Sequence, residues 1–320
     1  MTTATASGSS LTFTKARGVR KVKNNLATVL VYLAFGAALV PLVWLLWTVI
    51  SKGYHAIFAA SWWTSDQGGI DFKTKGGGAL AAIVGSAEQV ALCTAISVPI
   101  GILVGIYLVE YGRGVFARIT TFMVDIMTGI PSIVAALFIY ALFVTTLNGL
   151  KSGALVSFAL VILMVPVLVR TTEEMLRLVP NELREASYAL GVPKWRTIAK
   201  VVLPTAMSGL ITGVVLGIAR VAGETAPLLI LVGYAQRTDG DLFAQSQASL
   251  PTFIRDQFRN INTATGSGTY HLDANGNRVA GAVANYAPDR MWGAALTLII
   301  IVMGLNLIAR LIGRRTKIAS

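Results

Sequence analysis

Residues 79–109 read ALAAIVGSAEQVALCTAISVPIGILVGIYLV, a run of apolar and small residues that contains a single charge, Glu88. A helix needs about 20 consecutive apolar residues to cross the hydrocarbon core of a bilayer, so this run is long enough to span a membrane. The whole chain of 320 residues is 54% hydrophobic and only 13% charged, whereas soluble domains carry about 25% charged residues. The sequence therefore predicts a protein embedded in lipid.

Six apolar blocks of this kind occur along the chain. They predict an all-α, polytopic membrane protein with six transmembrane helices, at approximately residues 27–50, 79–109, 119–147, 153–169, 206–233 and 291–312. The first block is too long for the apolar region of a cleaved signal peptide. We therefore expect residues 25–320 to form one transmembrane domain, preceded by a basic cytoplasmic tail at residues 1–24 that is disordered.

The net charge of +12 also fits a protein that binds nucleic acid, so the placement of the charges has to decide. With the N-terminus in the cytoplasm, 17 of the 27 Lys and Arg residues fall in cytoplasmic segments and 9 in outer segments, while Arg220 lies inside a span. An excess of basic residues is typical of cytoplasmic loops. The distribution predicts a multi-pass protein of the bacterial inner (plasma) membrane, with both termini in the cytoplasm and no nucleic-acid partner.

The residue types that carry most enzyme and metal chemistry are scarce. Cys93 is the only cysteine and lies in an expected span, and the two histidines, His55 and His271, are far apart in the sequence. No disulfide framework and no metal site are expected from this pattern. Since no nucleophile and base recur together either, the chain is not expected to be an enzyme.

The cytoplasmic loop at residues 173–204 contains the stretch NELREASYALGVPKWRTIAKVVLP, residues 181–204. Apolar and small residues at positions 183, 186, 187 and 190 predict a short amphipathic helix, with Asn181 as its N-cap. Gly191 and Pro193 form a stop signal, and a second helix is expected from Lys194. A simple connecting hairpin would account for the periodicity equally well.

Two opposite charges lie within the fifth expected span, at Arg220 and Glu224. A charge at mid-membrane costs at least about 2.5 kcal/mol, so both side chains should face protein or water. Their spacing of four residues would place them on one face of a continuous helix, where they could neutralise each other and merely lock the helix. The other interpretation is that Arg220 contacts an anionic solute, because guanidinium offers paired donors that match phosphate oxygens.

The cytoplasmic loop resembles the coupling loop of ABC importer permeases, whose pattern is Glu-Ala-Ala, three residues, Gly, nine residues, Ile, one residue and Leu-Pro. The matching positions are Glu185-Ala186-Ser187, Gly191, Val201 and Leu203-Pro204, with Ser and Val as the two departures. The resemblance implies the type I ABC importer permease fold, and it implies that Glu185, Ala186, Ser187 and Gly191 couple the chain to an ATPase. The chain has no phosphate-binding loop of the form G-x4-G-K-[ST], so ATP would be bound by the partner subunit and no cofactor by the chain.

Three further motifs are similar to those of the PstA-type permeases of phosphate importers: IVGS at 83–86, GIPSI at 129–133 and ARVAGETAPLL at 219–229. The resemblance implies that the chain forms half of the pore of an ATP-driven importer of inorganic phosphate, with Arg220 and Glu224 on the substrate pathway. The implied partners are a second permease subunit of the PstC type, two ATPase subunits of the PstB type and a phosphate-binding protein of the PstS type.

Two other functions stay open on the sequence. An ABC permease for another oxyanion, such as sulfate or a phosphonate, would carry the same coupling loop. A secondary transporter or channel would work without ATP. The polar outer loop at residues 234–290 has no role assigned by the sequence.

Overall fold

The computed structural model describes residues 18–238, 240–243, 246–264, 270–272, 278–280 and 285–315. The chain divides into two units, Met1–Thr48 and Val49–Ser320. The first unit is represented by most of helix α1 (Gly18–Ile57). This helix already includes residues 18–24, which we expected to belong to the disordered tail, because Arg and Lys are good helix formers and no breaker separates them from the apolar run. Residues 1–17 of the tail lie outside the described residues.

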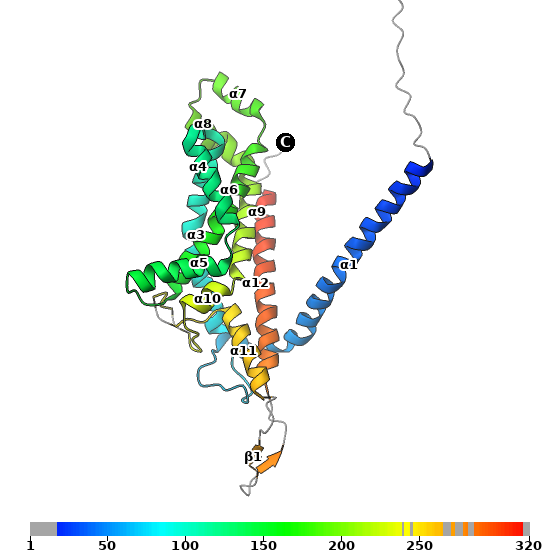
Figure 1. Cartoon of the computed structure of the whole chain (residues 1–320), viewed down its shortest axis with the longest axis vertical. Coiled ribbons are helices and arrows are strands. Elements are labelled where there is room, and N and C mark those ends of the chain that lie inside the picture. Colours follow the sequence, from blue (N-terminus) through cyan, green and yellow to red (C-terminus); the bar gives the residue numbers. More distant parts are fainter. Residues whose placement is uncertain are drawn as a thin grey trace, which may run out of the picture. The chain divides into compact units, whose positions relative to one another are not determined.

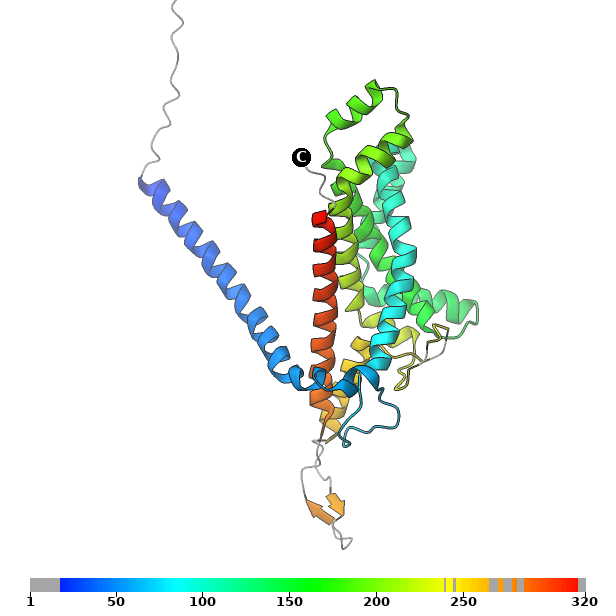
Figure 2. The same ribbon diagram turned by 180° about the vertical axis from the view of Figure 1, so that it is seen from behind.

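Four long helices lie side by side in the second unit: α3 (Leu80–Ile106), α6 (Gly153–Arg177), α9 (Leu203–Ala222) and α12 (Ala287–Arg315) (Figures 1 and 2). Helix α6 packs against both α3 and α9, and α9 packs against α12. Glycines permit the closest approach, since a Cβ on Gly101 would lie 2.5 Å from Cβ of Leu168, and one on Gly105 would lie 2.6 Å from Cβ of Thr172. Such small residues are typical of helix contacts in membranes.

The segment expected as the third span, 119–147, is divided. Helix α4 (Gly114–Thr128) is followed by α5 (Ser132–Ile139) and its π-helical continuation η2 (Tyr140–Thr146), and the two parts are bent by 107°. Gly129-Ile130-Pro131 forms the break, because proline has no N–H to donate and excludes the helical conformation from the residue before it. The described residues thus contain five continuous helices long and apolar enough to cross a membrane, and this bent pair is the sixth candidate.

The fifth expected span is interrupted as well. Helix α9 ends at Ala222, and the short helix α10 (Ala226–Leu231) begins after a break of three residues. Helix α10 packs against α5, so the two segments that follow the breaks meet each other. Figure 1 shows both crossing the direction of the long helices near the middle of their length.

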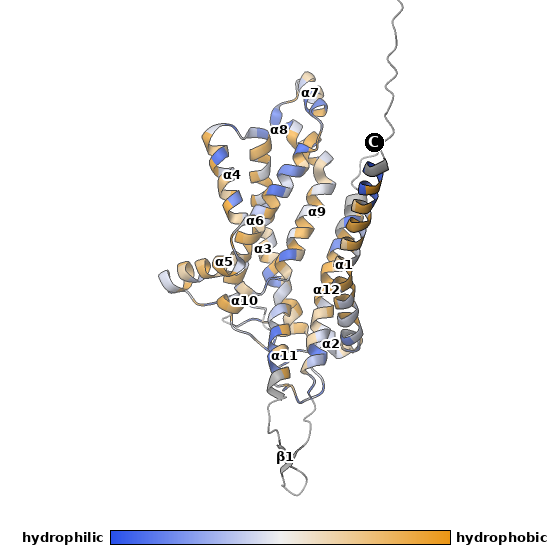
Figure 3. Cartoon of the chain, turned by 45° about the vertical axis from the view of Figure 1, so that its right-hand side comes forward, coloured by the Kyte–Doolittle hydropathy of each residue, from blue (hydrophilic) through white to orange (hydrophobic). Residues whose placement is uncertain are grey.

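The two ends of the helix bundle carry different elements (Figure 1). One end holds α7 (Asn181–Ala189) and α8 (Lys194–Thr197), which continues through η3 (Ile198–Val202) into α9; the π-helix η1 (Tyr107–Tyr111) ends α3 there. The other end holds α2 (Ala60–Thr64), α11 (Leu250–Ala264) and an antiparallel pair of strands, β1 (Tyr270–Leu272) and β2 (Arg278–Ala280). Polar colour concentrates in α7 and α11, whereas the long helices are mainly apolar (Figure 3).

Candidate functional site: the loop at residues 173–204 and the broken helices

The loop at residues 173–204 forms the helix–turn–helix that the sequence predicts. Helix α7 ends at Ala189 and α8 begins at Lys194, with Gly191 between them at φ +74°. This left-handed conformation favours glycine, and the Gly191 N–H donates to the carbonyl of Tyr188 at 2.9 Å. The expected N-cap is wrong in detail: Pro180 occupies the cap position and Asn181 is the first helical residue.

Three of the four predicted coupling residues share the accessible surface of this loop. Glu185, Ala186 and Gly191 are exposed. Exposed apolar residues accompany them, of which Leu190 is the most open at 83% exposure. Clustered apolar side chains on a water-facing loop are typical of a protein contact, so this face is suited to docking another subunit.

The fourth predicted coupling residue, Ser187, lies inside the loop. Its side chain is buried at 7% exposure, and its hydroxyl is 2.8 Å from the hydroxyl of Thr197 on α8. Ser187 therefore joins the two arms of the loop in this chain. The small side chain matters here because α7 and α8 approach each other at this point.

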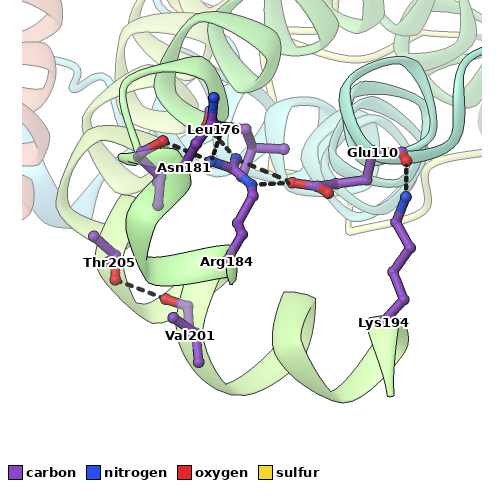
Figure 4. A network of polar contacts seen from close by, with 8 residues as sticks. Glu110, Leu176, Asn181, Arg184, Lys194, Val201 and Thr205 are labelled. Atoms are coloured by element: carbon purple, nitrogen blue, oxygen red, sulfur yellow. Dashed lines mark hydrogen bonds and ion pairs between the residues drawn. The ribbon is translucent and has the colours of Figure 1, made fainter. Parts of the chain in front are cut away.

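An ion pair connects α7 to the end of the second span (Figure 4). The Arg184 guanidinium lies 3.0 Å from the Glu110 carboxylate, and the two side chains are only 12% and 5% exposed. The same guanidinium donates to the carbonyls of Val179 (2.6 Å) and Leu176 (2.8 Å). The Lys194 ammonium donates to the Glu110 carbonyl as well. Both arms of the loop are thus fastened to η1.

The sequence analysis did not single out Glu110 or Arg184. The available signal was weak: Glu110 follows the apolar run 79–109 directly, as an interfacial charge would. Its partner lies 74 residues further along the chain, and no local pattern specifies that pairing.

A second charged network lies on α6, where Arg170 bridges Asp125 of α4 and Glu173 of its own helix. Glu173 is nearly buried at 6% side-chain exposure and also lies 3.7 Å from Arg177. Asp125 is itself 58% exposed at its side chain, so the network extends from the surface of α4 to the buried Glu173. This network holds the last turn of α4 against α6, just before the chain bends by 107°.

Arg220 and Glu224 do not form the helical pair that their spacing suggests. Arg220 lies in the last turn of α9, and Glu224 lies in the break that follows. Arg220 is exposed and Glu224 is half-buried. Among the described residues, no ion pair or hydrogen bond joins the two side chains, and Arg220 has no carboxylate within 4 Å. The guanidinium is therefore available to an anion or to another subunit.

The break after Arg220 has a local cause and a structural consequence. Gly223 closes α9 by donating its N–H to the Arg220 carbonyl at 3.3 Å, and Pro227 starts α10 within its first turn. Non-helical backbone at membrane depth is tolerated where it is buried in protein or lines a water-filled cavity. Interrupted helices of this kind often line the binding sites of transporters.

Metal chemistry has little support in the part of the chain that the structure describes. No group of three or more His, Cys, Asp or Glu side chains there is close enough to hold an ion. Cys93 is buried in α3, with its sulfur 3.7 Å from that of Met164.

Comparison with known proteins shows to which family this chain belongs. The family described as "Binding-protein-dependent transport system inner membrane component" matches residues 97–318. The phosphate transport system permease protein PstA of Mycobacterium leprae is 49% identical, covering 90% of this chain and 88% of that protein. PstA 1 of Mycobacterium tuberculosis (strain CDC 1551 / Oshkosh) is 47% identical, covering 92% and 89%.

The fold also resembles that of a permease of known structure. A chain in the crystal structure of a bacterial alginate ABC transporter, solved with a periplasmic protein that holds an alginate pentasaccharide, superposes with a TM-score of 0.62 at 13% identity. The match covers 95% of this chain and 100% of that one. The chain therefore belongs to the binding-protein-dependent transport system inner membrane components and, within that family of multi-pass membrane permeases, to the PstA proteins.

Proposed function

We propose that this chain is the membrane-spanning permease subunit of an ATP-driven importer of inorganic phosphate. The exposed guanidinium of Arg220 at the helix break carries this proposal, because it is a permanent positive charge within a span and has no carboxylate partner among the described residues. Glu224, half-buried in the break, would help to position or gate the anion. The names of the PstA relatives support phosphate as the substrate.

The chain would supply half of the pore. A second permease of the PstC type would supply the other half, two PstB-type ATPases would bind ATP, and a PstS-type binding protein would deliver phosphate from outside. Both termini and the loop at 173–204 would be cytoplasmic, as the distribution of basic residues predicts. The exposed face around Glu185, Ala186 and Gly191 supports the ATPase contact.

The geometry suggests how force would travel. Closure of the ATPases around ATP would move α7, and the Arg184–Glu110 ion pair would carry that movement to η1 and α3. Helices α8, η3 and α9 are continuous up to Arg220, so the same movement would also reach the helix break. Phosphate would leave the binding protein, pass Arg220 and enter the cytoplasm when the ATPases reopen.

Reconstitution of the complete transporter tests the proposal. Proteoliposomes with both permeases, the ATPase and external binding protein should accumulate phosphate only when ATP is enclosed with the ATPase. Sulfate and phosphonates should compete poorly; strong competition would favour the alternative oxyanions. Phosphate movement by the purified chain alone, without ATP, would instead identify a secondary transporter or channel.

A further inference from the structure

A cavity of about 540 Å³ is lined by residues of α10 and of α11, the helix at the end of the bundle opposite α7 (Figure 1). Ligand cavities typically have volumes of roughly 300–1,000 Å³, so a hydrated oxyanion fits with room to spare. Three segments line it: the loop after η2, helix α10 with the residues that follow it, and helix α11. Helix α11 belongs to the outer loop 234–290, to which the sequence assigned no role.

The charged side chains that line this cavity are mainly basic. Lys151, Arg255 and Arg259 line it, against one carboxylate, Asp256. Within the described residues Arg255 is exposed and has no ion-pair partner within 4 Å. The Lys151 ammonium lies 5.1 Å from the centre of the Tyr140 ring, a cation–π contact, and has no carboxylate within 4 Å among the described residues. Asp256 accepts hydrogen bonds from the amides of Gln257 and Asn260, both at 3.3 Å.

Tyr234 contributes a neutral side chain to the wall of the cavity. Its hydroxyl is buried with no hydrogen-bond partner among the described residues. A buried polar group without a partner costs roughly 1–3 kcal/mol, so an oxyanion that displaced the atoms covering this hydroxyl and accepted its hydrogen bond would recover that cost. Burial raises the pKa of Tyr234, which keeps the hydroxyl protonated and able to donate.

Helix α10 connects this cavity to the break beside Arg220. Its six residues cover roughly 9 Å. Glu224 lies two residues before its first residue, and Leu228 and Leu229 of the helix line the cavity together with Val232, which follows it. An anion that leaves the cavity along α10 would therefore reach the helix break, where Glu224 lies, and then Arg220 in the last turn of α9.

We propose that this cavity, lined by Lys151, Tyr234, Arg255 and Arg259, is an outer receiving site that holds the transported oxyanion between the binding protein and Arg220. The inference rests on the proposed function. It deepens that function by adding a second substrate site, in which Asp256 limits the affinity so that the anion can move on. Guanidinium groups suit it because their paired donors match the oxygens of phosphate.

The test neutralises the site in the complete transporter. The triple variant Lys151→Gln, Arg255→Gln, Arg259→Gln is reconstituted in proteoliposomes, and phosphate uptake is measured with saturating, phosphate-loaded binding protein. The expected uptake rate is lower by roughly tenfold or more, as expected when a focusing field is removed from a cleft. The remaining uptake should also lose most of its dependence on ionic strength.

A matched control removes the same charge from the same end of the molecule. Lys73→Gln, Lys75→Gln, Arg237→Gln neutralises three residues that do not line the cavity. This triple variant should retain uptake close to the wild type. An equal loss in both triple variants would overturn the site in favour of a general surface charge effect.

Two further measurements keep the test decisive. Copurification of the ATPase with each variant shows that the complex is assembled, and the single variant Arg255→Gln should show a partial loss. If the triple variant binds the loaded binding protein more weakly but transports normally at saturation, the cavity is a docking surface and the inference is wrong. If the wild type accumulates no phosphate at all, the proposed function itself fails.

Discussion

The guanidinium of Arg184 lies 3.0 Å from the carboxylate of Glu110, and this contact joins α7, the first helix of the loop at residues 173–204, to the end of the second span. Both side chains are largely shielded from water. Removing one partner of a buried pair typically costs about 3–5 kcal/mol, because a charge is left without its counter-charge. The pair therefore forms a firm connection through which a movement of α7 can displace η1 and α3.

Replacement of Glu110 by Gln should separate ATP hydrolysis from transport. The variant keeps the shape of the side chain but leaves Arg184 without its carboxylate, so movement of α7 would reach α3 only through the weaker contact of Lys194 with the Glu110 carbonyl. The phosphate taken up per ATP hydrolysed should fall severalfold in proteoliposomes. Arg196→Gln, which removes an exposed charge from the same loop, serves as the control. Normal coupling in Glu110→Gln would show that the pair has no mechanical role.

The hydrogen bond between Ser187 and Thr197 predicts a non-additive pair of mutations. Thr197→Val leaves the buried Ser187 hydroxyl without this partner, at a cost of roughly 1–3 kcal/mol, whereas removal of both hydroxyls is nearly neutral. Thermal unfolding of the complex and proteolysis of the loop should therefore show a larger effect for Thr197→Val than for Ser187→Ala with Thr197→Val. Simple addition of the single effects would argue against this hydrogen bond.

The turn at Gly191 depends on its positive φ of +74°. An alanine there would cost roughly 1–2 kcal/mol, because its Cβ crowds the next carbonyl oxygen in the left-handed region. Asparagine tolerates this conformation better, so Gly191→Asn should retain more uptake than Gly191→Ala. No atom lies within 4 Å of the added Cβ in this chain, and equal effects of the two variants would therefore indicate a clash with a partner subunit.

Glu185 is exposed on α7 and is expected to contact the ATPase. Glu185→Lys reverses a charge on that surface and should abolish copurification of the ATPase from mild detergent, together with phosphate uptake. Insertion into the membrane should be unchanged, since Glu185 has no ion-pair partner among the described residues. Recovery of a normal complex from the variant would exclude Glu185 from the contact.

Arg220 and Glu224 can be tested by exchanging their charges. If the two residues only neutralised each other, Arg220→Glu with Glu224→Arg would restore uptake that is lost in Arg220→Gln. The helix break between them predicts no restoration, because each position has its own surroundings. Both variants should still assemble with the ATPase. Normal phosphate uptake by Arg220→Gln would remove this residue from the pathway.

The sequence alone determined the membrane architecture and the outline of the loop. In lipid every backbone group must find its partner within the chain, so a long apolar run has to form a helix. The α7–Gly191–α8 turn was equally predictable, because the left-handed glycine and the following proline act locally. The breaks at Gly129-Ile130-Pro131 and at Gly223 were harder to predict. The glycine and proline residues are visible in the sequence, but the tertiary environment decides whether a helix bends or ends there.

Only the tertiary structure decided which distant residues meet. The spacing of Arg220 and Glu224 suggested a pair, yet the helix ends between them, so the periodicity on which that inference depended does not continue. Conversely, 74 residues separate Arg184 from Glu110, and their contact follows from how α6 returns the chain to the end of α3. The cavity arises in the same way, because the three segments that line it lie far apart in the sequence. Helix formation is local, whereas the position of one helix against another depends on packing along the whole chain.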